Sequence, residues 1–163
     1  MKAASLKDIQ TELENLSPQE VMALCLRLAR FKKENKELLT YLLFEAFDEE
    51  AYVSVIKKEV EEQFAAINTS SLYFVKKSLR KILRMISKFS RYTGSPVVEI
   101  QLLLHFCNYL NESGISINDS LALLNIYQNQ IKKIRKLIAT MHEDLQFDYL
   151  KELTKTLSAV ESR

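Results

Sequence analysis

The chain has 163 residues, the length of one ordinary domain, which we expect to span residues 1–163. Its apolar share of 47% and charged share of 27% are those of a globular protein and argue against disorder. The net charge of only +2 gives little support by itself to nucleic-acid binding. Because no run approaches 18 apolar residues and residues 1–10 lack the apolar core of a signal peptide, we expect a cytoplasmic protein without a membrane span.

The scarcity of turn residues predicts the fold class. The chain holds two glycines and two prolines, whereas sheets and hairpins need such residues at many turns. Leu, Lys, Glu and Ala are abundant, which favours helices. We therefore predict an all-α protein of about eight helices, in stacked antiparallel pairs that form a bundle or a short helical-repeat array.

Helix-start signals divide the N-terminal third of the chain. Ser5 is expected to cap a first helix. The sequence Ser17-Pro18-Gln19-Glu20 predicts the start of a second, with an N-cap serine, a proline in the first turn and a glutamate that closes a capping box. A third helix is predicted over residues 35–47. The second helix has an apolar stripe formed by Val21, Leu24, Leu28 and Phe31.

Five further helices are predicted downstream. Asp48 caps the fourth, which runs to about Ala66, and the fifth spans residues 72–93 with Gly94 at its end. The sixth begins at Pro96 and is apolar nearly all round, so we expect it to be the central, buried helix. The seventh, capped by Asn118 or Asp119, covers residues 119–141, and the eighth covers about 144–160.

The fifth and seventh helices resemble each other. Their apolar residues follow the same 3-4-3-4-3 spacing at an offset of 52 residues, so that Leu79 corresponds to Ile131. One interpretation is a true repeat, as in solenoids of stacked helical pairs. The other is that amphipathic helices with heptad spacing align easily. The sequence leaves both open.

Charge is unevenly distributed along the chain. Residues 1–62 hold 9 basic and 13 acidic side chains, whereas residues 63–142 hold 11 basic and 3 acidic ones. On the fifth helix, six basic residues share a sector about 100° wide, opposite the Leu79/Ile82/Ile86 stripe. The seventh helix adds three more. Together they form a candidate binding surface, the basic face: Lys77, Arg80, Lys81, Arg84, Lys88, Arg91, Lys132, Lys133 and Lys136.

A helix face with one sign of charge needs compensation, because like charges at this spacing repel. The compensating charge can come from the chain's own acidic helices near Glu59 or after His142, from an acidic protein partner, or from a polyanion. Our leading interpretation is a non-catalytic module that binds a protein partner through a helical face. The alternative is sequence-independent nucleic-acid or polyanion binding through the basic faces of helices 72–93 and 119–141.

Residues with catalytic or metal-binding potential are few. Cys25 and Cys107 are expected to be small buried hydrophobic residues. His105 lies on the apolar sixth helix, where a core histidine is favoured over a metal ligand, and His142 stands with Glu143 at a helix start. We therefore expect no enzyme, no catalytic residue, no cofactor and no metal site.

The stretch Leu6–Tyr52 carries a resemblance. It contains Leu-Lys-Asp-Ile-x-x-Glu-Leu, then Leu-Ser-Pro-Gln-Glu-Val, then Phe-Lys-Lys-x-x-Lys-Glu. In these motifs it resembles the opening of small bacterial all-helical proteins classed as domains of unknown function. The resemblance covers under a third of the chain and implies no substrate, cofactor or site.

Overall fold

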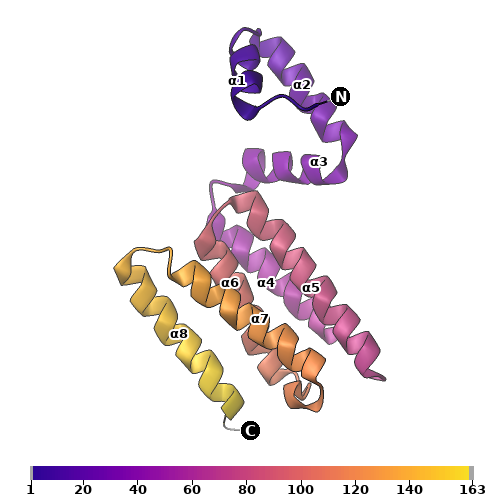
Figure 1. Ribbon diagram of the computed structural model, residues 1–163. Coiled ribbons are helices and arrows are strands. Elements are labelled where there is room, and N and C mark those ends of the chain that lie inside the picture. Colours follow the sequence, from indigo (N-terminus) through magenta and orange to yellow (C-terminus); the bar gives the residue numbers. More distant parts are fainter. Residues whose placement is uncertain (1, 162–163) are drawn as a thin grey trace. The chain divides into compact units, whose positions relative to one another are not determined.

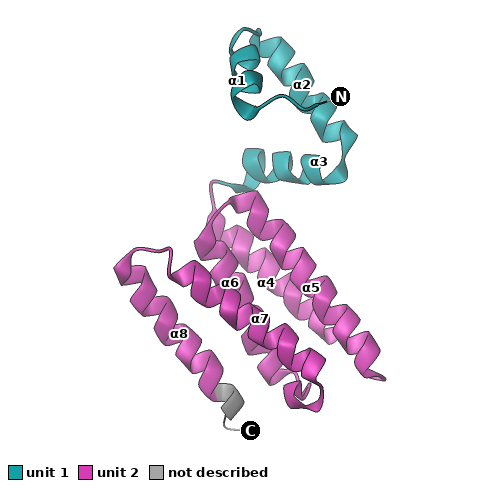
Figure 2. Cartoon of the chain, in the orientation of Figure 1, with its two compact units in different colours: residues 1–46 teal, residues 47–163 magenta. Residues whose placement is uncertain are grey.

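The computed structural model describes residues 2–161, and side chains as far as residue 158. Within this range the chain consists of helices joined by loops, with no strand, which confirms the predicted all-α fold of packed helix pairs (Figure 1). The chain divides into two compact units, which we call the N-terminal unit, Met1–Ala46, and the C-terminal unit, Phe47–Arg163 (Figure 2). Each is described by itself, and one domain over residues 1–163 stays a prediction.

The N-terminal unit contains α1 (Leu6–Glu14), α2 (Pro18–Phe31), α3 (Lys33–Thr40) and the π-helical segment η1 (Tyr41–Glu45). The predicted capping box at the start of α2 is confirmed. The backbone N–H of Glu20 donates to Oγ of Ser17 at 3.3 Å, and the backbone N–H of Ser17 donates to the Glu20 carboxylate at 2.8 Å. These two bonds satisfy donors that the first helical turn would otherwise leave without partners.

The connection from α2 to η1 differs from the predicted single helix over residues 35–47. Lys32 adopts an extended conformation between α2 and α3, and Nδ2 of Asn35 donates to the Leu28 carbonyl at 2.9 Å, which closes the end of α2. At the other end, the N–H of Ala46 donates to the Tyr41 carbonyl at 2.8 Å. This five-residue spacing widens the last turn into a π-helix, which apolar periodicity does not reveal.

The C-terminal unit contains α4 (Glu49–Ala65), α5 (Leu72–Thr93), α6 (Pro96–Glu112), the short 3-10 helix η2 (Ile117–Asp119), α7 (Leu121–Ile138) and α8 (Glu143–Glu161). Gly94 ends α5 in the left-handed conformation, with φ of 64°, as expected. The predicted cap of α7 was wrong. Because Asn118 and Asp119 belong to η2, it is Oγ of Ser120 that accepts from the N–H of Ala122.

Helix α6 occupies the centre of the C-terminal unit, as its sequence predicted. It packs against α4, α5, α7 and α8, and successive helices of the unit alternate in direction (Figure 1). Burying one large aliphatic or aromatic side chain contributes roughly 1.5–3 kcal/mol to stability. The buried residues of α6 are Val98, Ile100, Leu102, Leu103, Leu104, Phe106, Cys107, Leu110 and Asn111.

The corresponding stripes of α5 and α7 are buried at matching positions. Leu79 and Ile131 are both buried, and so are three further pairs at the same offset of 52 residues. Both helices pack on α6 and also contact each other. The shared spacing therefore reflects a shared packing role. The remaining buried pairs are Val75 and Tyr127, Ile82 and Ile134, and Ile86 and Ile138.

A buried polar group joins the last three helices. Nδ2 of Asn111 on α6 donates to the Thr156 carbonyl of α8 at 3.1 Å and to the Tyr127 hydroxyl of α7 at 3.4 Å. Burial raises the pKa of Tyr127, and the Asn111 hydrogen bond opposes that rise. Because an unpaired amide in this position would cost free energy, the three helices are held in one register.

We predict that Leu79→Ala and Ile131→Ala each destabilise the protein by about 2–5 kcal/mol, because each leaves a cavity in the core around α6. The free energy of unfolding in urea is the measurement. Leu121→Ala is the matched control, since that side chain is 74% exposed, and it should change stability by less than about 0.5 kcal/mol. Equal stability of all three variants would contradict the assigned core.

Candidate functional site

The basic face of α5 points away from the core. Lys77, Arg80, Lys81, Arg84 and Arg91 are exposed, on the side opposite the buried stripe of Leu79, Ile82 and Ile86. The sixth predicted member differs, because Lys88 is half-buried and its ammonium lies 4.6 Å from the centre of the Phe89 ring. Lys88 is therefore held by its neighbours on α5.

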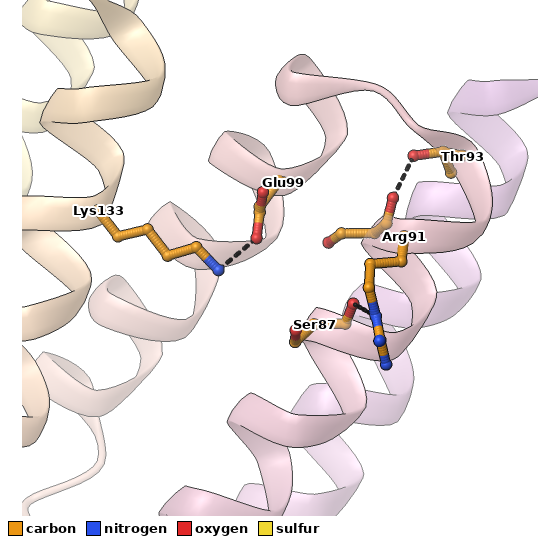
Figure 3. A network of polar contacts seen from close by, with 6 residues as sticks. Ser87, Arg91, Thr93, Glu99 and Lys133 are labelled. Atoms are coloured by element: carbon orange, nitrogen blue, oxygen red, sulfur yellow. Dashed lines mark hydrogen bonds and ion pairs between the residues drawn. The ribbon is translucent and has the colours of Figure 1, made fainter. Parts of the chain in front are cut away.

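The chain's own carboxylates leave most of this face without ion pairs. Among the described residues, no carboxylate lies within ion-pair distance of Lys77, Arg80, Lys81 or Arg84. Nε of Arg91 donates to the Ser87 carbonyl at 3.3 Å (Figure 3). The cationic groups near Arg84 thus face solvent, which answers the question of internal neutralisation that the sequence left open.

Helix α4 borders the basic face near Lys81. Lys81 lines a shallow hollow of about 580 Å³ together with Glu59, Glu62 and Lys58 of α4. These carboxylates moderate the potential near Lys81 from beyond ion-pair distance. Arg80 and Arg84 do not line the hollow.

Helix α7 contributes fewer free cations than the sequence suggested. Lys132 and Lys136 are exposed, but Nζ of Lys133 lies 2.5 Å from Oε1 of Glu99 on α6 (Figure 3). The Glu99 side chain is mostly covered, so this pair helps to hold α7 on α6. Lys133 is therefore a packing residue, and we leave it out of the binding surface proposed below.

His105 faces α4 as a half-buried histidine. Its Nε2 lies 3.1 Å from Oε1 of Glu61, although the angle does not suit a hydrogen bond, and its ring lies 6.0 Å from that of Tyr109. Burial lowers the pKa of His105, the nearby Lys57 ammonium lowers it further, and Glu61 opposes both. The neutral imidazole is thus favoured near pH 7.

The two cysteines lie in different environments. Cys107 is buried on α6, as predicted, and burial raises the pKa of its thiol to about 12, so the reactive thiolate is scarce. The prediction that Cys25 is buried was wrong, because its side chain is exposed on α2. His142, Glu143 and Asp144 stand at the start of α8, where Nδ1 of His142 lies 3.5 Å from Oδ2 of Asp144.

The N-terminal unit exposes most of its apolar side chains. Tyr41 is its only buried residue among those described. The predicted stripe of α2 is not covered within the chain, since Leu28 is 60% exposed and Phe31 is 75% exposed. Helices of this length cannot enclose a core by themselves, so apolar side chains that a longer bundle would bury remain at the surface.

A groove lies within this unit between α2 and the α3–η1 segment, and we call it the α2–α3 groove. Its volume is about 580 Å³. Its apolar lining consists of Leu26, Ala29, Leu39, Leu43 and Phe44, while Arg30, Lys33, Lys36 and Thr40 supply its polar atoms. None of these nine residues is acidic.

Sequence reasoning missed this groove for a specific reason. It assigned α2 one apolar face through Leu24 and Leu28, whereas Leu26 and Ala29 lie on the opposite side of the helix. One pattern in the sequence could have indicated the groove. It is a second strip at helical spacing, formed by residues 26, 29, 30 and 33 and continued by residues 36, 39, 40, 43 and 44. Within that strip two apolar residues are followed by three basic ones, and the rest are apolar except Thr40.

Comparison with known proteins adds no assignment. No family model, curated protein or solved structure matches this chain. The resemblance of Leu6–Tyr52 to small bacterial helical proteins stays a prediction. None of the described helices combines the length and apolar character that crossing a membrane requires.

We predict that His105 makes stability fall as the pH drops below about 6.5. Because the folded-state pKa of His105 lies below its unfolded value, the unfolded chain binds more protons, and stability falls as pH drops below the unfolded value of about 6.5. Urea unfolding at several pH values measures this loss. His105→Gln should reduce it, whereas His142→Gln, at an exposed position, should not. A His105→Gln profile identical to wild type would contradict the assignment.

Proposed function

We propose that this chain is a non-catalytic helical interaction module that binds a protein partner through the exposed apolar surface of its N-terminal unit. The observation that carries the proposal is the exposure of Leu28, Phe31, Leu43 and Phe44, at 60–75% each, in a unit whose only buried described residue is Tyr41. Exposed large apolar side chains gathered in one region mark interaction sites, because covering them releases the free energy of the hydrophobic effect. The cytoplasm remains the proposed location, where an exposed thiol such as that of Cys25 stays reduced.

The physical argument concerns what can cover such a surface. Each Å² of apolar surface removed from water contributes about 25 cal/mol. Aromatic side chains contribute most per residue at interfaces, and Phe31 and Phe44 are the large exposed aromatic residues of this unit. A partner that covers either phenylalanine and the leucines near it obtains the apolar centre of a typical interface.

We predict that a photoreactive phenylalanine analogue at Phe31 or Phe44 forms a discrete adduct with another protein in the native cell. The same analogue at Phe147 on α8 is the matched control, because that aromatic side chain is also exposed, at 69%, but lies outside the N-terminal unit. Mass spectrometry of the adducts is the measurement. Adducts of equal yield at all three positions, or none at Phe31 and Phe44, would contradict the proposal.

A second candidate function is sequence-independent binding of nucleic acid or another polyanion. It is favoured by the exposed cations Lys77, Arg80 and Arg84 of α5, which have no carboxylate partner among the described residues, and by Lys132 and Lys136 of α7. Binding of this kind draws its free energy from the release of counterions by phosphates. It uses a surface of the C-terminal unit, so the two functions can be tested separately.

If the basic face binds phosphates, affinity for duplex DNA should fall with salt, with a slope of log K against log salt of about −0.9 per contact. Arg84→Glu should weaken binding and reduce the slope, while unfolding free energy stays within roughly 0.5 kcal/mol of wild type, because Arg84 is exposed and unpaired. Lys151→Glu on α8 is the control for net charge. No retention on heparin at low salt would rule this function out.

A further inference from the structure

We infer that the α2–α3 groove is the docking site for an acidic amphipathic helix of the protein partner. The inference rests on the proposed function and specifies both the place of binding and the chemistry of the ligand. It comes from two properties of the groove, the spacing of its apolar residues and the single sign of its charges.

The apolar residues are spaced to receive a helix. On α2, Ala29 and Arg30 follow Leu26 at intervals of three and four residues, and Lys33 at the start of α3 continues the lining. On the other wall, Leu39 and Leu43 are four residues apart, and Phe44 follows Leu43 directly. Two helical walls at an apolar floor accept a third helix that presents large side chains at positions i, i+3, i+4 and i+7.

The π-helical segment contributes to the mouth of the groove. Leu43 and Phe44 belong to η1, and both are more than 60% exposed. Tyr41, at the start of the same segment, is buried. Leu43 and Phe44 are therefore available to a ligand.

The basic residues of the groove favour a ligand of negative charge. Arg30, Lys33 and Lys36 all line it, and no lining residue is acidic. One internal compensation exists, because Nζ of Lys33 lies 3.7 Å from Oε1 of Glu37, but the Lys33 side chain is 88% exposed. Such an exposed ion pair contributes little to stability, so Lys33 can readily pair with a carboxylate of a ligand instead. A helix with Glu or Asp beside its apolar stripe therefore complements the groove in shape and charge.

A second copy of this chain is the less suitable occupant. A symmetric dimer closed through the groove would place the same patch on both sides of the interface. Arg30, Lys33 and Lys36 of one copy would then meet their own counterparts, and juxtaposed like charges oppose association. The groove's composition thus favours a different, acidic partner.

The test uses the full chain and two synthetic helical peptides with one apolar stripe of leucines. One peptide carries glutamate at all flanking positions and the other carries lysine. Fluorescence anisotropy measures binding of each. We expect the glutamate peptide to bind and the lysine peptide to bind at least tenfold more weakly. A scrambled glutamate peptide, which keeps the charge but loses the stripe, should not bind.

Variants of the chain locate the binding site. Arg30→Glu combined with Lys36→Glu should weaken binding of the glutamate peptide about tenfold, as expected when two charge pairs change from attraction to repulsion. Leu43→Ser should weaken it separately, by removing part of the apolar wall. Lys32→Glu is the matched control, because Lys32 is exposed but does not line the groove, and it should change affinity by less than about twofold. Circular dichroism confirms that each variant keeps its helix content.

Four results would overturn the inference. Equal binding of both peptides would show that the groove does not select acidic helices. Unchanged binding by the Arg30/Lys36 double variant would show that the peptide binds elsewhere. Sedimentation that shows a dimer abolished by Leu43→Ser would identify a second copy as the occupant. Photo-adducts at Phe31 and Phe44 without groove-dependent peptide binding would leave the proposed function standing and this inference refuted.

Discussion

Helix α6 is apolar around nearly its whole circumference, and the arrangement of the C-terminal unit follows from the need to cover it. Four helices pack against it, and each contributes one apolar stripe while its other side remains in water. For α5 and α7 the stripe lies opposite the basic residues. Burial of Leu79 and Ile131 therefore also directs Arg84 and Lys132 outward, so the core determines where the basic face lies.

In the N-terminal unit, by contrast, most apolar helix faces are not covered by other helices. Its helices are also amphipathic, but they are short and few, and no central helix joins them. Leu28 and Phe31 remain exposed where the corresponding residues of a longer bundle would be enclosed. The C-terminal unit thus buries most of its large apolar residues in its own core, whereas the N-terminal unit leaves most of them exposed.

Local signals made much of the fold predictable. Ser17 and Glu20, Gly94, and Ser95-Pro96 each act through neighbouring backbone groups, so helix starts and ends near them could be read from sequence. The central place of α6 followed from its composition. The π-turn at Tyr41 and the cap at Ser120 could not be foreseen, because each depends on competition between several similar local alternatives.

The candidate surfaces were predictable only in part, because tertiary contacts decide them. Periodicity placed Arg84 and Lys133 on comparable helix faces, yet Lys133 meets Glu99, which lies 34 positions earlier and across a helix interface. Cys25 was mispredicted for the same reason. It lies within an apolar helical run, but whether another helix covers it depends on tertiary contacts. Sequence patterns describe the faces of a helix, whereas only the fold determines which faces are covered.

The buried amide of Asn111 links the detachment of α8 to the core of the C-terminal unit. Detachment of α8 would break the bond to Thr156 and leave the buried Asn111 amide with one partner fewer. Fraying of the C-terminal helix is thereby coupled to opening of the centre of the bundle. We therefore expect amide protons around Asn111 and along α8 to exchange as one cooperative unit.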